Sequence, residues 1–472
     1  MRNRLISGKE ATAYNSIGPT MSSAVFLRKA RRRLSFESSF LHKRSHIFTL
    51  SLQDLRRRCV SGLLAAIRET LFKIASIHAR HRNKLARFRS PSEMDRRKGA
   101  LFIGYAEGNL GLGQVFRNNL RAAQAVALPF GIYPFRIGIK KRLLHPFMPE
   151  RYDKVHAYDV NIILVATEQV PNVLRSVDAR LLNNTYNVLQ TFWELPKAPE
   201  AWRQILRSVD EIWAPSTFVA NAFLPIFSGP INLVPPVVNV GEPPAHARDH
   251  FGMVLNRFYF MFSFDYHSSP YRKNPIGALQ AFQHAFRRND ENVGLVIKSI
   301  GNLNRYAEVT AALRQAAATD PRIVLIERNL SRAEILGLIY ASDAYISLHR
   351  SEGFGMGMAE AMNFGRIVIA TDYSGCTDFL TQQTGFPIPF SLRPVAVHEY
   401  PWSDKQFWAE PDISSAAAAM QTILKLPHVA RERADAGQKF IQQKYGTSAV
   451  GEIMKTRICH LMRNARDGPR HP

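Results

Sequence analysis

Short apolar runs alternate with helical stretches from residue 98 onwards, whereas the first 97 residues lack this alternation. The runs are rich in β-branched and aromatic residues, which is typical of buried parallel strands. In the first half, strands are expected at 99–105, 160–165, 186–190, 211–214 and 231–234, and helices at 115–126, 201–209 and 217–224. This order predicts a doubly wound parallel sheet.

A second alternation begins beyond a Pro- and Gly-rich linker at 235–244. Strands are expected at 258–264, 294–298, 322–326, 343–348 and 367–370, and helices at 275–286, 356–364 and 430–462. We therefore predict an α/β protein with two Rossmann-like, doubly wound parallel-sheet domains that face a cleft. The predicted boundaries are 1–97 for a basic extension that is helical or disordered, 98–243 and 244–429 for the two domains, and 430–472 for C-terminal helices.

The basic character of the chain is concentrated at its N-terminus. Residues 1–99 hold 23 Lys and Arg against 6 Asp and Glu, a net charge of +17, and residues 100–472 contribute +7 of the total of +24. The sequence contains no run of 18 apolar residues, so no transmembrane helix is predicted. The three cysteines lie far apart and form neither a disulfide framework nor a zinc pattern, which suits a reducing compartment.

Three interpretations of residues 1–93 remain open. Apolar residues recur at rough helical spacing between 48 and 80, as in a basic amphipathic helix that lies on an anionic membrane. The composition also fits a solvated or disordered basic arm. In the third interpretation the segment is not native, and the protein starts at Met94.

The segment 351–362 carries the most specific chemistry of the chain. It follows the predicted strand at 343–348, and its glycines precede a helix-forming run that begins at Met356. A strand, a glycine loop and a helix N-terminus present backbone N–H groups and the positive end of the helix dipole to an anion. Glu352 and Glu360 bracket the loop, and their carboxylates suit hydroxyls or cations rather than phosphate. Backbone N–H groups that can donate to phosphate, flanked by carboxylates that can accept from hydroxyls, predict a sugar-nucleotide site.

These residues resemble the E-x7-E pattern of retaining glycosyltransferases with the GT-B fold, especially glycosyltransferase family 4 of the bacterial polysaccharide and lipopolysaccharide type. The resemblance rests on Glu352 and Glu360, on the enclosed 353–355, and on the segment 371–378; it extends over about residues 98–462. It implies two Rossmann-like domains, an acceptor domain and a nucleotide-sugar domain, with terminal helices that cross back to the first.

The resemblance also implies a role for each residue of the loop. Glu360 is expected to bond the ribose hydroxyls of the donor nucleotide, and Glu352 to contact hydroxyls of the transferred sugar. Backbone N–H groups are expected to face the sugar and phosphates at Gly353, Phe354, Gly355 and Met356. In this family the donor's own phosphate oxygen is thought to take the acceptor proton.

Three cations are candidates for the diphosphate. Arg272 and Lys273 follow the strand at 258–264, and Lys298 ends the next strand. Ligands bind at the carboxyl ends of parallel strands, so these side chains are expected to neutralise a pyrophosphate without a metal. Family-4 enzymes have a similar Arg and Lys, but here Asp265-Tyr266-His267 replaces the usual Gly-Arg turn. A basic surface turn is the alternative.

A glycine loop with Gly111 and Gly113 follows the first strand and could contact the donor phosphates from the other domain. An NAD-dependent Rossmann oxidoreductase is the alternative. Its G-x-G-x-x-G fingerprint is incomplete because Phe116 takes the third position, and the acidic residue expected on the ribose is missing. The loop therefore favours the glycosyltransferase.

Candidates for the acceptor follow two strands of the first domain. Trp193 and Glu194 come after 186–190 and resemble a segment of bacterial family-4 enzymes, and Glu168 comes after 160–165. An aromatic ring can stack on a sugar and a carboxylate can accept from its hydroxyl, but Trp193 and Trp213 equally fit the core. The chain has no Asp-x-Asp motif and no histidine spacing for a metal, so no metal site is expected.

The sequence predicts a retaining hexosyltransferase that moves a sugar from a GDP-, UDP- or ADP-linked donor to a glycan or lipid-linked glycan, in cell-surface polysaccharide synthesis. No cofactor is expected, and nucleic acid is not an expected partner. The protein is expected in the cytoplasm, at the inner membrane face if residues 1–93 bind lipid. A basic membrane- or nucleic-acid-binding protein without catalysis is the second alternative.

Overall fold

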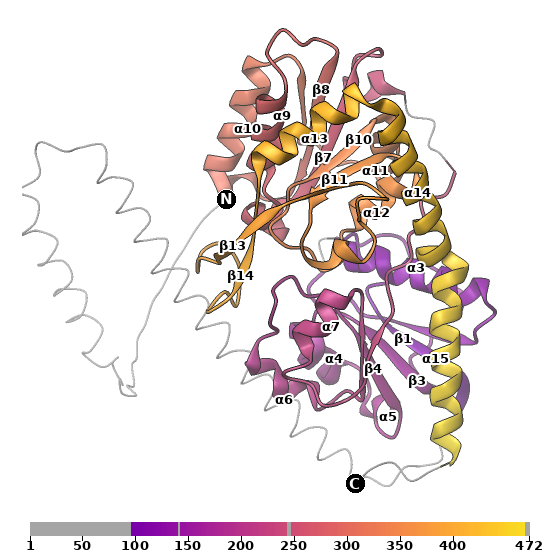
Figure 1. Ribbon diagram of the computed structural model, residues 1–472. Helices are drawn as coiled ribbons and strands as arrows, with labels where there is room; N and C mark the ends of the chain where they lie inside the picture. Colours follow the sequence, from indigo (N-terminus) through magenta and orange to yellow (C-terminus); the bar gives the residue numbers. More distant parts are fainter. Residues whose placement is uncertain (1–95, 140–141, 243–246, 468–472) are drawn as a thin grey trace, which may run out of the picture. The chain divides into compact units, whose positions relative to one another are not determined.

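The structure, a computed structural model, describes residues 96–139, 142–242 and 247–467. The interpretations of residues 1–93 lie outside this range. The described chain forms two six-stranded sheets and a separate two-stranded hairpin (Figure 1). Neighbouring strands within each six-stranded sheet are parallel, so the predicted α/β class with two doubly wound sheets is confirmed.

The first sheet has the order β2-β1-β3-β4-β5-β6. Its strands are β1 (Arg96–Gly104), β2 (Phe130–Pro134), β3 (Ala157–Leu164), β4 (Tyr186–Gln190), β5 (Glu211–Ala214) and β6 (Ile231–Leu233). The helices of this half are α3 (Gly111–Ala125), α4 (Val170–Ser176), α5 (Ala179–Leu182), α6 (Arg203–Leu206) and α7 (Thr217–Phe223). Side chains of β1 and β3 are buried on both faces of the sheet, which explains their nearly continuous apolar sequences.

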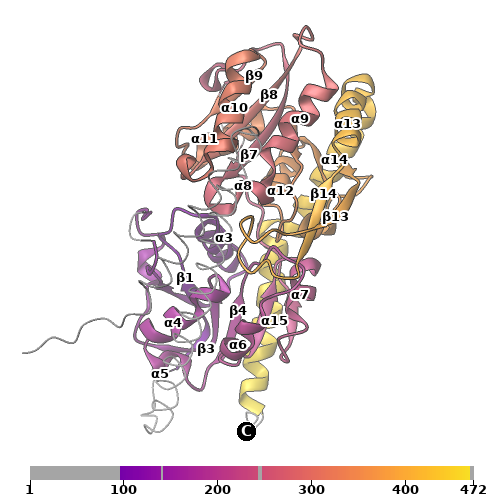
Figure 2. The same cartoon turned by 90° about the vertical axis from the view of Figure 1, so that its left-hand side faces the viewer.

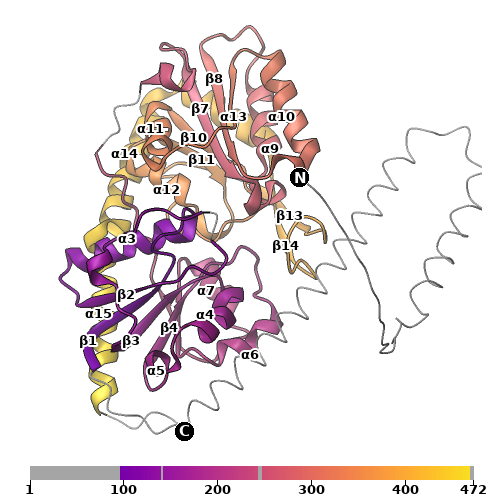
Figure 3. The same cartoon turned by 180° about the vertical axis from the view of Figure 1, so that it is seen from behind.

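The second sheet has the order β12-β11-β10-β7-β8-β9. Its strands are β7 (Phe258–Asp265), β8 (Val293–Ile300), β9 (Ile323–Ile326), β10 (Ala344–Ser347), β11 (Ile367–Thr371) and β12 (Phe386–Ile388). One face packs on α9 (Pro275–Ala285), α10 (Ala307–Thr319) and α13 (Ile413–Lys425), and the other on α11 (Arg332–Ala341), α12 (Met356–Asn363) and α14 (Pro427–Tyr445), as Figure 3 shows from behind.

The helix expected at 430–462 is two helices, α14 and α15 (Thr447–Asp467), which meet at Gly446. Helix α15 packs on the first sheet beside α3. A Cβ at Gly451 would lie 2.7 Å from the Ala122 carbonyl oxygen, so only glycine permits this approach. The Lys455 ammonium donates to the Val126 carbonyl at 2.8 Å. Within the described ranges, no helix is both long and apolar enough to span a membrane.

The sequence did not predict the antiparallel hairpin of β13 (Phe390–Pro394) and β14 (Phe407–Pro411), visible in Figure 2. The hairpin leaves the second sheet after β12, and Trp408 and Val395 join the apolar core of the first half. We call the connection between its strands, residues 395–406, the strap. Figure 2 shows it as the loop beyond β13 and β14.

Candidate functional site

The glycine loop between β10 and α12 is held by the neighbouring segment 374–378. The Glu352 N–H donates to the Ser374 hydroxyl at 2.8 Å, and the Gly375 N–H donates to the Glu352 carbonyl at 2.9 Å. A Cβ at Gly375 would lie 2.3 Å from the Gly353 carbonyl oxygen. Gly355 has a φ of +101° and begins α12 without a side-chain cap. The first N–H groups of α12 therefore receive no side-chain bond from the N-cap residue.

Glu352 pairs with two of the three predicted cations, Arg272 and Lys273. Its Oε2 lies 3.1 Å from Nη1 of Arg272, and its Oε1 accepts a hydrogen bond from the Lys273 ammonium. Both cations belong to the short helix α8 (Pro270–Lys273), which follows β7, a neighbour of β10 in the sheet. The structure thus brings together three residues that the sequence placed in one site.

The charges of this cluster are mutually dependent. Burial opposes ionisation of Glu352, but the charges of Arg272 and Lys273 outweigh it and lower its pKa to about 2. Burial lowers the pKa of Lys273, and the attraction of Glu352 opposes this shift. Burial also acts against the charge of Arg272, but Glu352 and Glu194 raise its pKa above the ordinary value. Glu194, from the first half of the chain, therefore shares the field of this cluster.

The two cations differ in what surrounds them. The Arg272 side chain is 3% exposed, and its guanidinium also donates to the carbonyl oxygens of Ser268 and Ser351, at 3.2 and 2.7 Å. The Lys273 side chain is 21% exposed. Arg272 thus fixes the glycine loop against α8, while Lys273 is the cation that a ligand can reach.

Glu360 lies on α12, buried, with a different partner. Arg332 at the start of α11 binds it with two hydrogen bonds, of 3.2 and 2.5 Å. Arg332 was not among the residues that the sequence indicated. The capping box of Ser331 and Glu334 marks the start of α11 and could have located it.

Lys298 is not in the Glu352 cluster. It is 2% exposed on β8, and its ammonium donates to the Ser299 carbonyl at 2.5 Å. Burial lowers its pKa to about 8, despite the attraction of Asp265. Phe354 is also buried and packs against Phe379 and Tyr445, so its contribution to a site is limited to its backbone.

The predicted glycine loop of the first half forms the start of α3. The helix begins at Gly111, where a Cβ would meet nothing within 4 Å, whereas a Cβ at Gly113 would lie 2.2 Å from the Gly108 carbonyl oxygen. Phe116 packs so closely on Gly104 that a Cβ there would lie 2.5 Å from its ring. A bulky phenyl ring thus occupies the contact that the third glycine of a dinucleotide fingerprint normally provides.

The acceptor candidates have distinct surroundings. Trp193 is 5% exposed, packs on Trp202 with ring centroids 4.8 Å apart, and donates its indole N–H to the Lys197 carbonyl. Trp213 is fully buried. The structure therefore favours the core alternative for both rings. Glu168 and Glu194 are half-buried, and each accepts a hydrogen bond from the strap.

His349, which follows β10, is fully buried, and its Nε2 lies 3.2 Å from the Tyr373 carbonyl oxygen. Burial lowers its pKa. No group of three or more His, Cys, Asp or Glu side chains in the described part of the chain is arranged to hold a metal ion.

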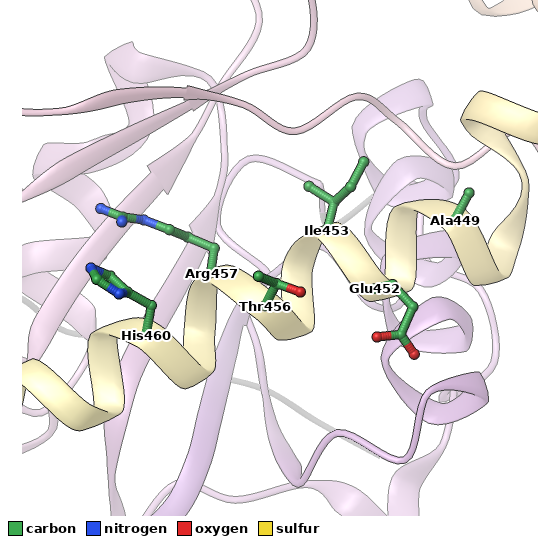
Figure 4. Close-up of a pocket in the computed structure, with 6 residues that line it drawn as sticks. All are labelled: Ala449, Glu452, Ile453, Thr456, Arg457 and His460. Atoms are coloured by element: carbon green, nitrogen blue, oxygen red, sulfur yellow. The ribbon is translucent and has the colours of Figure 1, made fainter.

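A hollow of about 540 Å³ lies on α15, away from these residues. Figure 4 shows its lining, which is Ala449, Glu452, Ile453, Thr456, Arg457 and His460. Arg457 in this lining pairs with the buried Glu211 at 2.6 Å. The hollow contains none of the predicted site residues.

Known structures share this fold. A sucrose-phosphate synthase from Thermosynechococcus elongatus matches at a TM-score of 0.58 and 15% identity, over 78% of this chain and 100% of the other. Anabaena Alr3699/HepE in complex with UDP and glucose matches at 0.54 and 13%, over 78% and 100%. The match to S. aureus TarM G117R spans 66% of this chain and 55% of that protein, with a TM-score of 0.47 and 13% identity. The fold is GT-B.

Residues 264–440 match the family model described as "Glycosyl transferases group 1". This range includes Arg272, Lys273, Glu352 and Glu360. A comparison with curated protein sequences finds no match. The fold and the family match together support a GT-B glycosyltransferase.

Proposed function

We propose that this chain is a retaining glycosyltransferase of family 4, which transfers a hexose from a nucleotide diphosphate sugar to a hydroxyl of a glycan or glycolipid. The observation that carries the proposal is the cluster of Lys273, Arg272 and Glu352 beside the glycine loop. The cluster combines cations for a leaving diphosphate with a carboxylate for sugar hydroxyls. Synthesis of a cell-surface polysaccharide, on the cytoplasmic side of the membrane, is the setting we infer for it.

The donor diphosphate is the ligand that the cations suit best. Lys273 forms an ion pair with Glu352, and Arg272 also donates to two backbone carbonyls. A bound diphosphate would attract Lys273 and leave one oxygen of Glu352 to accept from sugar hydroxyls. The N–H groups of Gly353 to Met356 and the open start of α3 at Gly111 would add partial positive charge. Solved complexes of Anabaena HepE contain UDP and UDP-glucose, which supports a nucleotide-sugar donor.

The transfer itself would need little from protein bases. The bond between the anomeric carbon and the diphosphate oxygen breaks, and the acceptor oxygen bonds that carbon on the same face. The acceptor proton passes to the departing phosphate oxygen. Lys273 stabilises the charge that develops on the diphosphate, which is the kind of electrostatic contribution that dominates many enzymes.

Glu360 is the proposed ligand of the donor ribose. Its carboxylate is oriented by two bonds from Arg332 and remains able to accept further hydrogen bonds, because each oxygen has two lone pairs. Lys298, buried on β8, would act on the nucleotide through its charge rather than by contact.

A screen of UDP-, GDP- and ADP-linked sugars tests the proposal. We expect one donor class to raise the thermal midpoint and to be hydrolysed slowly, with release of nucleotide diphosphate. We also expect EDTA to leave the activity intact, because Lys273 and Arg272 supply the positive charge. A shift with NAD(H) alone, together with hydride transfer, would instead support the oxidoreductase.

We further propose that residues 1–93 contribute affinity for anionic lipid, on the basis of their charge in the sequence. Each well-placed basic residue would add about 1 kcal/mol, and salt would reduce it. Co-sedimentation with phosphatidylserine vesicles should separate the full chain from one that starts at Met94. Equal binding of both would contradict this role.

A further inference from the structure

The strap links the proposed donor cluster to the acceptor candidates of the first half. On the first half, the Tyr400 hydroxyl donates to Oε2 of Glu194 at 2.7 Å, and the Trp402 indole N–H donates to Oε1 of Glu168 at 2.7 Å. The Gln406 side chain donates to the Lys197 carbonyl at 2.8 Å. The strap thus donates to both carboxylates that the sequence predicts as acceptor ligands, Glu168 and Glu194.

On the second half, the strap is bonded to the helix that carries the cations. The Ser269 hydroxyl donates to the Glu399 carbonyl at 2.7 Å, and Ser269 is the N-cap residue of α8. The Arg272 guanidinium lies 5.8 Å from the centre of the Tyr400 ring. Tyr400 is therefore placed between the Arg272 cation and the Glu194 carboxylate.

Ion pairs connect the base of the strap to the hairpin strands. Arg393 of β13 binds Glu399 with two hydrogen bonds of 2.8 Å and donates to Glu410 of β14 at 2.6 Å. The Arg350 guanidinium also donates to Glu410, and the backbone N–H of Arg350 donates to the Arg272 carbonyl at 2.8 Å. The position of Tyr400 is thus fixed by bonds to the same segment that fixes Arg272.

Glu194 keeps one oxygen available. Tyr400 occupies Oε2, and Oε1 has no hydrogen-bond partner among the described residues. Glu194 is half-buried and its charge acts on Arg272 and Lys273, so this oxygen can accept a hydrogen bond from a hydroxyl near the cations. Burial raises the pKa of Tyr400 well above 10, so it remains a donor at neutral pH.

We propose that the strap forms the acceptor side of the site, and that Tyr400 is a positioning residue that orients Glu194 to bind the acceptor hydroxyl. The ligand class is a polyhydroxylated acceptor, such as a sugar residue of a glycan. This inference rests on the proposed function. It adds the strap, which is distant in sequence from Glu194, to the segments that determine acceptor specificity.

The test is a double-mutant cycle of Tyr400→Phe and Glu194→Gln, measured with the best donor from the screen and its acceptor. We expect each single variant to raise the acceptor KM about fivefold or more, because each weakens one hydrogen bond. The dissociation constant of the nucleotide diphosphate should stay within about twofold. In the Glu194→Gln background, Tyr400→Phe should have little further effect, because it acts through that carboxylate.

Tyr186→Phe is the matched control, since Tyr186 donates to Glu211 at 3.2 Å outside the site. It should leave the acceptor KM unchanged. Additive effects of Tyr400→Phe and Glu194→Gln, or a loss of thermal stability with an unchanged acceptor KM, would overturn the inference and leave the proposed function intact. If wild-type protein transfers no sugar from any donor, the proposed function and this inference both fail.

Discussion

The two six-stranded sheets both consist of parallel strands, but the polar groups at their carboxyl ends are organised differently. In the second sheet, Lys273 follows β7 and Glu352 follows β10, and these strands are neighbours. In the first sheet, Glu168 and Glu194 follow β3 and β4, and each is held by a residue more than 200 positions later. The proposed donor side is therefore built within one half, whereas the proposed acceptor side needs both.

This difference explains why one side is recognisable from short motifs. Both pairs of residues follow neighbouring parallel strands, but only the pair in the second sheet lies beside a glycine loop that the sequence marks. The acceptor side depends on where the strap packs. Changes to the donor cluster should therefore affect the donor and turnover, and changes to the strap should affect the acceptor.

The largest effect is expected for Lys273→Ala. Removal of one group that stabilises developing charge typically costs about 3 kcal/mol, so turnover should fall by about 100-fold or more. Initial rates at saturating donor and acceptor would measure it. The control is Lys425→Ala on the exposed end of α13, which should retain full turnover. Turnover within a factor of two of wild type for Lys273→Ala would remove this lysine from the reaction.

The next effect concerns Glu360. Glu360→Gln would weaken the charged hydrogen bonds that we propose between Glu360 and the donor ribose, each worth about 1.5–3 kcal/mol, so the donor should bind at least tenfold more weakly. Calorimetric titration with the nucleotide diphosphate would measure this. Arg332→Gln breaks the same ion pair but leaves the carboxylate in place, so it should cost less donor affinity. If both variants lose only thermal stability, the pair is structural.

Lys298 is a buried cation on β8, and its titration should make the free energy of unfolding depend on pH. Its pKa of about 8 lies below the ordinary value near 10.4 of an unfolded lysine. Between these two pH values the unfolded state binds more protons, so the free energy of unfolding should rise with pH. Lys298→Met should abolish about 2 kcal/mol of this rise. Urea unfolding at pH 7.5 and 9.5 gives the comparison, and identical pH dependence in both proteins would contradict the assigned shift.

The smallest effect is expected on the acceptor side. Trp402→Phe keeps an aromatic ring in the strap but removes the N–H that donates to Glu168, which should raise the acceptor KM about fivefold. Trp408→Phe is a matched control on the same hairpin, because the Trp408 Nε1 has no hydrogen-bond partner in the described ranges. Its acceptor KM should stay at the wild-type value. A change in donor affinity for Trp402→Phe alone would show that the two sides are not separable.

The sequence predicted most of the fold because strands such as β7 and β8 are apolar on both faces and flanked by helices of ordinary length. It indicated Glu352 because a glycine loop follows that residue, and Lys273 because it follows the carboxyl end of a strand. It missed β2, and it extended the helix at 201–209 beyond the four residues of α6. The predicted domain boundaries and the roles of individual site residues remain predictions.

The strap could not be derived in the same way. Apolar and polar residues alternate at 390–394, as in a strand with one exposed face, but they do not alternate at 407–411, so the hairpin has only half of its sequence signal. Nothing local indicates that Tyr400 reaches Glu194, because that bond depends on tertiary packing across 206 residues. The pairing of Arg332 with Glu360 is a second case, since it requires α11 and α12 to pack on one face.

The central claim is transfer with retention by the cluster around Glu352. Proton NMR of the product, recorded within minutes of mixing enzyme, donor and acceptor, tests it most directly. We predict that the anomeric proton of the transferred sugar has the same configuration as in the donor, and that this signal is lost in Lys273→Ala. A product with the inverted anomeric configuration would contradict the account.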